Sequence, residues 1–160
     1  MEDLVQRDAA DLDRLSDIAR SRGLRIAVVE SLTSGNLAGT VGAAGEAAEW
    51  FAGGVVAYMT DVKEQLLGLE HGTDPCSADC AEQLARGARA LFDADLCVST
   101  TGVGGPGPDD GHPPGTVYLG WATRKQVGHR HLRLDGGPEE VLAATVTAAV
   151  RMLTTHAAEI

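Results

Sequence analysis

The sequence predicts an α/β fold, a three-layer α/β/α sandwich whose mixed, mostly parallel sheet ends in a late antiparallel hairpin. Helix-like and strand-like segments alternate along most of the 160 residues. An apolar segment at residues 24–29 runs directly into a polar turn and a helix start. Residues 116–123 and 127–134 are both strand-like and are separated by a short turn. Short connections join antiparallel strands, so this pair predicts a hairpin within a single domain over residues 1–160.

Apolar periodicity and stop signals define the elements of the first half of the chain. Leu12, Leu15 and Ile18 recur at helical spacing, and Gly23 supplies a stop. The expected elements, in order, are a helix over 11–22, a strand over 24–29, a small-residue helix over 37–44, a helical segment over 46–51, a strand over 55–59 and a helix over 60–67. The glycine pair at 53–54 should break the chain before the second strand, and Thr60 should cap the following helix.

The second half of the chain follows the same alternation. Ser77 is a suitable cap for a helix with an apolar stripe that extends to Leu91, and Pro138 suits a helix start. The expected elements are a loop over 71–75, a helix over 77–91, a strand over 95–101, a turn-rich loop over 102–115, the two hairpin strands and a closing helix over 138–150.

Composition and charge narrow the class of protein. Apolar residues make up 44% and charged residues 22% of the chain, which is typical of soluble globular proteins. The net charge of −10 argues against nucleic acid as a partner, because phosphate backbones bind clusters of Lys and Arg. The sequence has no recognisable secretory segment and no apolar run of membrane-spanning length. We therefore expect a cytoplasmic protein without membrane contact, and leave homo-oligomerisation open.

The cysteines indicate a reducing compartment rather than a disulfide framework. Cys76, Cys80 and Cys97 are odd in number, and the first two have a spacing that a metal pair on a helix could use. No matching His or Cys pair lies near them in the sequence, and zinc sites usually need three or four ligands. The sequence therefore predicts neither a metal site nor a cofactor.

The polar turn after the first strand is the strongest candidate for a ligand site. It lies before a helix start, where the first helical N–H groups have no partner inside the helix. Its candidate residues are Glu30, Ser31, Thr33, Ser34 and Gly35. Two interpretations stay open: Thr33 or Ser34 merely caps the helix, or the hydroxyls bind a ligand. Likewise, Glu30 either positions a hydroxyl or caps backbone N–H groups.

Two further loops, at residues 58–63 and 101–107, should converge on this turn. Open α/β sheets bind ligands beyond the carboxyl ends of their parallel strands. Lys63 is the candidate base if burial or a neighbouring cation lowers its pKa, and is otherwise a solvated surface lysine. Tyr58 is either a tyrosine at the edge of the core or a hydroxyl donor to the substrate.

The glycine-rich loop does not match the familiar nucleotide-binding motifs. No helix follows it and Pro106 interrupts it, which excludes the Rossmann fingerprint, and no Gly-Lys-Ser/Thr closes a Walker A loop. It is either a plain turn-rich loop or a loop whose backbone N–H groups approach an anion. Its candidate ligand-binding residues are Thr101, Gly102, Gly104 and Gly105.

Several of these motifs occur together, in order and at a characteristic spacing. They are Glu30-Ser31-Leu32-Thr33-Ser34-Gly35, Tyr58 with Lys63 and Leu67-Gly68, Ser77, Thr101-Gly102-Val103-Gly104-Gly105-Pro106-Gly107, and Gly115-Thr116-Val117. With them the chain resembles the CinA carboxyl-terminal domain of the competence-damage-inducible family, whose active members are nicotinamide-nucleotide amidases. The resemblance covers essentially the whole chain. Without the amino-terminal domain of full-length CinA proteins, a stand-alone form is expected.

The resemblance implies metal-free hydrolysis of nicotinamide mononucleotide to nicotinic acid mononucleotide and ammonia, a step of pyridine-nucleotide salvage. In such acyl transfer a hydroxyl attacks the carboxamide, a base takes its proton and backbone N–H groups stabilise the oxyanion. The implied catalytic residues are Ser31, Lys63 and Tyr58. The first helix start and the glycine loop would hold the phosphate and ribose of this nucleotide.

The chain departs from the usual family pattern at several positions. Ala47-Ala48 replaces a Ser-Ser pair that includes a serine proposed for catalysis. Pro138 replaces an arginine, and Leu142 stands where a second arginine is expected. Two hypotheses therefore remain: an amidase rearranged around Ser31 and Lys63, or a catalytically degenerate relative that binds a small anionic ligand or a partner protein.

Overall fold

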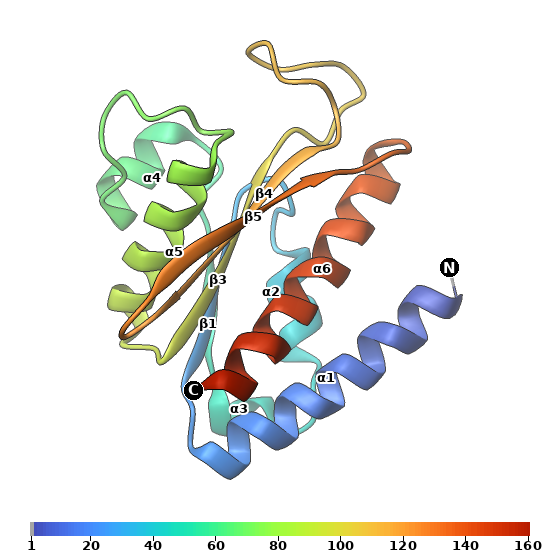
Figure 1. Cartoon of the computed structure of the whole chain (residues 1–160), viewed down its shortest axis with the longest axis vertical. Helices are drawn as coiled ribbons and strands as arrows, with labels where there is room; N and C mark the ends of the chain where they lie inside the picture. The colour runs from blue at the N-terminus through green and yellow to red at the C-terminus, as the bar shows by residue number, and fades with distance from the viewer. Residues whose placement is uncertain (1) are drawn as a thin grey trace.

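The computed structural model describes residues 2–160 and has one five-stranded sheet between two layers of helices (Figure 1). In chain order the elements are α1 (Glu2–Arg22), β1 (Ile26–Glu30), α2 (Asn36–Gly42), α3 (Ala47–Trp50), β2 (Phe51–Val56), α4 (Thr60–Leu67), α5 (Ala78–Phe92), β3 (Leu96–Gly102), β4 (Thr116–Thr123), β5 (Val127–Arg133) and α6 (Pro138–Glu159). The predicted α/β class and the alternation of helices and strands are confirmed.

The sheet is mixed, as predicted. Its strand order is β2-β1-β3-β4-β5. β1 lies between β2 and β3 and is parallel to both, whereas β4 is antiparallel to β3 and to β5. The carboxyl ends of the three parallel strands therefore meet at one end of the sheet. The hairpin of β4 and β5 forms the far edge.

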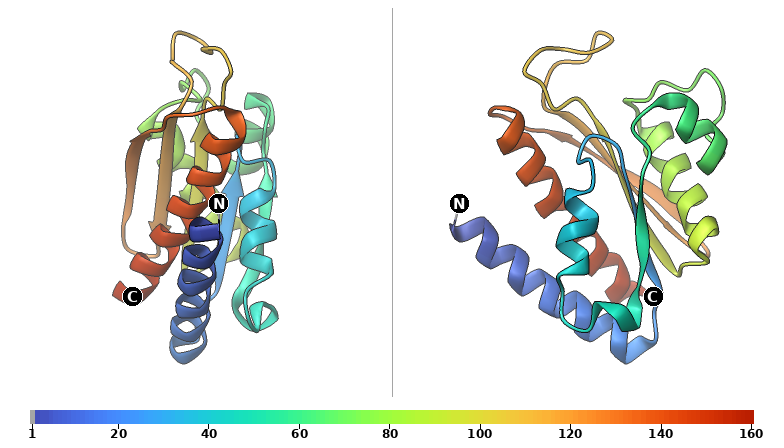
Figure 2. Two further views of the ribbon diagram at one scale, coloured as in Figure 1. Left: turned by 90° about the vertical axis from the view of Figure 1, so that its right-hand side faces the viewer. Right: turned by 180° about the vertical axis from the view of Figure 1, so that it is seen from behind.

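Alternating side chains of the strands build two hydrophobic cores, one on each face of the sheet. On β1, Ile26 and Val28 face a core that includes Leu15 of α1 and Leu153 of α6. The alternate residues of β1, Ala27 and Val29, face a smaller core formed with α4 and α5. Figure 2 shows the resulting layers, with α1, α2 and α6 on one side of the sheet and α4 and α5 on the other. The predicted sandwich is thus confirmed.

Strand β2 begins earlier than the sequence predicts. It spans Phe51–Val56 and includes the glycine pair that was expected to precede a strand at 55–59. A Cβ on Gly54 would lie 2.9 Å from both the Ala38 Cβ and the Val28 Cγ2. The glycine therefore allows β2 to lie close to β1 and α2, and does not break the chain. Similarly, Thr60 is the first residue of α4 rather than its cap, and Met59 takes the cap position.

The closing helix is longer than the expected 138–150. α6 has 22 residues, and by length and apolar composition alone it could cross a membrane, contrary to the sequence expectation. Half of its most apolar segment is buried inside the protein. Val141, Val150 and Leu153 are fully buried in the larger core. In this structure α6 is packed as a core helix against α1 and β3.

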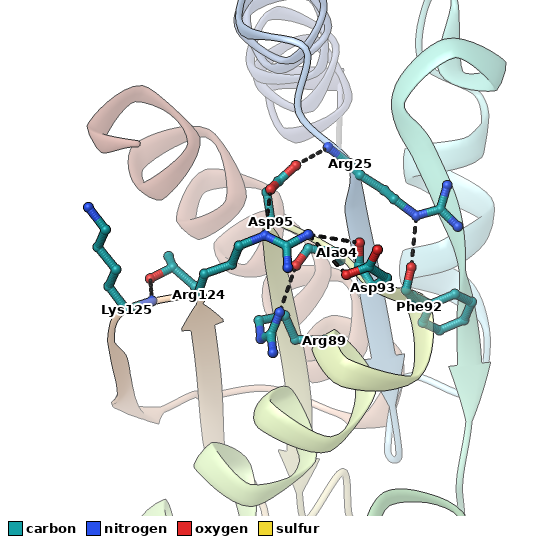
Figure 3. A network of polar contacts seen from close by, with 9 residues as sticks. Arg25, Arg89, Phe92, Asp93, Ala94, Asp95, Arg124 and Lys125 are labelled. Atoms are coloured by element: carbon teal, nitrogen blue, oxygen red, sulfur yellow. Dashed lines mark hydrogen bonds and ion pairs between the residues drawn. The ribbon is translucent and has the colours of Figure 1, made fainter.

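A polar network fixes the end of the sheet where β1 and β3 begin (Figure 3). Asp95 accepts hydrogen bonds from the backbone N–H of Arg25 at 2.8 Å and from Arg124 Nε at 2.9 Å. Desolvation raises the pKa of Asp95, but these hydrogen bonds outweigh it and leave the pKa below its usual value. Arg124 also pairs with Asp93, so the β4–β5 turn is tied to the end of α5.

Candidate functional site

A cavity of about 500 Å³ lies beyond the carboxyl ends of β1 and β3. The turn after β1, the segment at 58–63 and the loop after β3 all contribute to its lining, as do residues 74–76 and the start of α6. In Figure 1 the loop at 102–115 extends beyond this end of the sheet. The three loops singled out in the sequence are therefore parts of one cavity.

Lys63 is buried, contrary to the interpretation as a solvated surface lysine. Its side chain lines the cavity, yet the residue is only 2% exposed. Its Nζ donates a hydrogen bond of 2.7 Å to the backbone carbonyl of Tyr58. Burial lowers the pKa of Lys63, and the neighbouring Cys80 acts in the opposite direction. A lowered pKa increases the fraction of neutral amine, which is the form that can accept a proton.

Ser31, Ser34 and Tyr58 also line the cavity. The backbone N–H of Ser31 donates to the Thr100 carbonyl at 3.0 Å, which ties the turn to β3. Ser34 has a φ of 51°, and its N–H donates to the Ser31 carbonyl at 3.1 Å. Tyr58 is largely exposed, so its ring lies at the rim of the cavity rather than at the edge of the core.

Glu30 caps helix α2 from within the core. Its carboxylate is fully buried and accepts hydrogen bonds from the N–H groups of Leu37 at 2.7 Å and Ala38 at 3.0 Å. The cap position of α2 is Gly35, with no side-chain cap bond, so neither Thr33 nor Ser34 caps the helix as the sequence allowed. Of the two interpretations of Glu30, the structure supports the capping of backbone N–H groups.

Thr33 is also turned away from the cavity. It is fully buried, and its Oγ1 lies 2.7 Å from the Oγ1 of Thr100 on β3. Glu30, Thr33 and Gly35 do not contribute to the lining of the cavity. These residues hold the turn in place beneath Ser31 and Ser34.

The glycine loop contributes backbone to the cavity. Thr101, Gly102, Gly104 and Gly105 all line it. The Thr101 hydroxyl donates to the Pro75 carbonyl at 2.5 Å and so joins the loop to the segment before α5. Gly102 has a φ of 149°, and a Cβ there would lie 2.8 Å from the Val117 Cα on β4. Glycine is therefore required at 102 where two antiparallel strands approach closely.

Four polar residues of the cavity were not singled out in the sequence. They are Asp74, Asp109, Asp110 and His112. His112 Nε2 lies 2.8 Å from Asp74 Oδ2, although the two residues are 38 positions apart. The other Asp74 oxygen accepts the N–H of Cys76 at 2.9 Å. Both loops lack hydrophobic periodicity, so no sequence pattern indicated this pairing; the charged residues among prolines and glycines were the available signal.

The positions that depart from the family pattern fall in two different places. Ala48 is exposed on α3, which lies at the opposite end of the molecule from the 102–115 loop (Figure 1). Next to it Glu49 pairs with Arg20 at 3.0 Å, near the end of α1. By contrast, Pro138 and Leu142 line the cavity. Ala48, where the resemblance expects a serine, therefore lies outside the lining of this cavity, whereas the two positions where it expects arginines lie in that lining.

The cysteines are free and buried. Burial raises the pKa of Cys76 and of Cys80, each to about 11. Among the residues whose side chains the structure describes, no group of three or more His, Cys, Asp or Glu is arranged to hold a metal ion. Cys76 lines the cavity, where its raised pKa makes it a poor nucleophile.

Comparison with known sequences identifies relatives. The CinA C-terminal domain family matches residues 10–157. A protein of Geobacillus kaustophilus named for competence-damage inducibility is 41% identical over 135 residues, which are 82% of this chain and 32% of that protein. A CinA-like protein of Geobacter sulfurreducens is 36% identical over 141 residues, which are 84% of this chain and 34% of that protein. The chain thus spans about a third of the length of these relatives.

Solved structures share the fold over nearly the whole chain. A CinA superfamily protein from Klebsiella pneumoniae 700603 superposes with a TM-score of 0.90 at 29% identity, covering 96% of this chain and 99% of that one. A competence/damage inducible protein of Agrobacterium tumefaciens gives a TM-score of 0.85 at 31% identity, with 92% and 94% covered. Family match, sequence identity and architecture agree, and the chain belongs to the CinA C-terminal domain family.

Proposed function

We propose that the protein is an amidohydrolase that releases ammonia from the carboxamide of nicotinamide mononucleotide. The observation that carries this proposal is Lys63, a buried amine with a lowered pKa in the lining of a cavity that also contains the Ser31 hydroxyl. A lysine of this kind can act as a general base towards a neighbouring hydroxyl. Tyr58, at the rim, is placed to contact the substrate.

The charges of the cavity suit this substrate at both of its ends. The nicotinamide ring of the nucleotide is a pyridinium cation, which Asp74, Asp109 and Asp110 would attract. The phosphate is an anion that backbone N–H groups of the 102–107 loop could bind. α6 begins at Pro138 beside the cavity, so the positive end of its dipole favours an anion there.

The reaction can be written with these residues alone. The Ser31 Oγ attacks the carboxamide carbon while the neutral Lys63 Nζ accepts the hydroxyl proton. The C–N bond then breaks, and ammonia leaves with the proton returned by Lys63. Water, deprotonated by Lys63, then attacks the ester carbon; the bond to the Ser31 Oγ breaks, Lys63 returns the proton to that oxygen, and the acid is released as its carboxylate. Within the described part of the chain Nζ makes one hydrogen bond, to the Tyr58 carbonyl, so a shift towards Ser31 must accompany substrate binding.

A second function has its own supporting observation. Pro138 and Leu142 line the cavity at positions where the family resemblance expects arginines, so two phosphate contacts are replaced by apolar surface. In this alternative the protein is catalytically degenerate and binds a small anionic ligand or a partner protein without turnover. The exposed position of Ala48 weakens the alternative, because the missing serine lies away from the cavity.

One experiment separates the two functions. Purified protein is mixed with nicotinamide mononucleotide, and ammonia and the melting temperature are both measured. The amidase predicts ammonia that depends on enzyme concentration, and loss of that ammonia in Ser31→Ala. No ammonia together with a melting temperature raised by millimolar ligand supports the binding protein instead. No ammonia and no shift contradict both functions.

We extend this proposal to the cellular compartment and the oligomeric state of the protein. Free buried cysteines and the use of a nucleotide substrate support a cytoplasmic protein.

Five of the seven exposed large hydrophobic residues in the described chain lie within residues 56–66, beside the edge strand β2. β2 carries neither charge nor proline, the usual protections of an edge strand. A second copy of the chain would cover this patch and, with it, the exposed Tyr58 at the cavity.

Sedimentation tests this pairing of two copies. Met59→Glu places a charge in the patch and should convert a dimer to a monomer. Ile160→Glu, at an exposed hydrophobic position that follows α6 and lies beside the β4–β5 turn, should leave the dimer intact. A wild-type protein that sediments as a monomer at high concentration contradicts the proposal.

A further inference from the structure

A second cavity, of about 340 Å³, lies next to the first. His112 lines both, and through its Nε2 it is held to Asp74 in the lining of the first cavity. The ends of the hairpin strands form the opposite side, since pairing of β4 and β5 places Tyr118 opposite His131 and Thr116 opposite Arg133. The two cavities thus meet at one residue and open at the same end of the sheet.

The second cavity contains a pair of stacked rings. The ring centroids of Tyr118 and His131 are 4.3 Å apart, and their planes differ by 9°. His131 is exposed on β5, the edge strand, so no further strand covers the outer side of this pair. A second stacked pair, Trp121 with His156, lines a separate cavity, so it is the position of the Tyr118–His131 stack beside the first cavity that singles it out. Planar nucleobases stack on such rings.

The charges next to the stacked rings suit a phosphate. Arg133 lines the cavity and is exposed, and it takes no part in the ion pairs found among the described residues. Residues 124–133 contain several Arg and Lys and no Asp or Glu, in a chain whose net charge is −10. A guanidinium without a carboxylate partner can bind phosphate oxygens in a bidentate manner. Asp135, also in the lining, can accept a hydrogen bond from an exocyclic amino group of a base.

We propose that the second cavity is a nucleotide subsite in which the Tyr118–His131 stack receives a base and Arg133 binds its phosphate. The same chemistry fits two sources. The nucleotide is either a separate mononucleotide or the far half of a dinucleotide whose carboxamide end occupies the first cavity. The second source rests on the proposed amidase function, whereas the subsite itself does not.

Titration with adenosine 5′-monophosphate tests the subsite without any turnover. Calorimetry should show binding to the wild type, weakened about ten-fold or more by Arg133→Ala because a charge-assisted contact is lost. Arg130→Ala is the matched control, since Arg130 is an exposed arginine of the same strand that pairs with Leu119 on the other face of the sheet. His131→Phe should retain the affinity and His131→Ala should lose it. No binding at millimolar nucleotide, or equal weakening by Arg133→Ala and Arg130→Ala, would overturn the subsite.

Ammonia release distinguishes the two sources. If the subsite holds half of a dinucleotide, Arg133→Ala should raise KM for nicotinamide adenine dinucleotide about ten-fold and leave KM for nicotinamide mononucleotide unchanged. Ammonia from the mononucleotide alone assigns the subsite to a separate nucleotide. Ammonia from neither substrate refutes the amidase, and the titration with adenosine 5′-monophosphate still decides whether the subsite exists.

Discussion

Replacement of Glu30 by glutamine should destabilise the fold by about 2–4 kcal/mol. The Glu30 carboxylate is fully buried and accepts the N–H groups of Leu37 and Ala38 at 2.7 and 3.0 Å. Glutamine has the same shape but offers one oxygen, and its NH₂ group would face the second backbone N–H. One buried donor then loses its partner, at about 1–3 kcal/mol, and the remaining bond loses its charge, at about 1 kcal/mol. The melting temperature should fall by about 6–12 °C.

Urea unfolding followed by circular dichroism measures this loss. Glu49→Gln is the matched control, because Glu49 forms an exposed ion pair with Arg20. Pairs of that kind contribute less than about 1 kcal/mol. If Glu30→Gln destabilises the protein no more than Glu49→Gln, the reasoning that Glu30 caps α2 is wrong. Loss of ligand binding at unchanged stability would instead return Glu30 to the ligand-binding residues.

Three other predictions concern burial. Lys63→Met should be more stable than the wild type at pH 7, since the lowered pKa of Lys63 means that folding opposes its charge. The difference in the free energy of unfolding between the two proteins, measured in urea, should shrink as the pH rises from that lowered pKa towards 10.5. A difference that stays constant with pH would contradict this prediction. Gly87→Ala should lower the free energy of unfolding by about 1–3 kcal/mol, because a Cβ at this position of α5 would overlap the Leu67 carbonyl of α4. Gly39→Ala, where the added Cβ would meet nothing, should raise it by about 0.5–1 kcal/mol. Equal effects of the two substitutions in the same assay would exclude the α4–α5 contact as the cause. The three free cysteines, all buried, should resist a thiol reagent at pH 8 until the protein is unfolded, and rapid labelling of the native protein would contradict their burial.

Local patterns in the sequence were sufficient to predict most of the fold. The apolar segment before Glu30 and the short turn at Arg124 each have one simple solution, a buried strand and a hairpin. The glycines of β2 were misjudged because their function depends on packing. Gly54 is needed where β2 lies against Val28 and Ala38, and the identity of these neighbours is set by the tertiary structure.

The convergence of the three loops on one cavity could be predicted from the sequence, whereas the orientation of individual side chains in this candidate site could be predicted less well. Topology places the carboxyl ends of parallel strands together, so the contributions of Ser31 and Lys63 to one cavity could be anticipated. The directions in which the Glu30 and Thr33 side chains point could not be anticipated. Glu30 accepts a backbone N–H of α2 and Thr33 bonds the Thr100 hydroxyl, and these partners compete with any ligand. The pairing of His112 with Asp74 joins two irregular loops, and no periodicity predicts such contacts.

The most direct test of the central claim is the rate of ammonia release from nicotinamide mononucleotide by two lysine variants. Lys63 and Lys125 are the lysines of this chain. Lys63 is buried at the cavity, while Lys125 is exposed in the β4–β5 turn. If Lys63 is the base, Lys63→Met should lower kcat by at least about 100-fold, and Lys125→Met should equal the wild type. Retention of wild-type kcat by Lys63→Met would contradict the account.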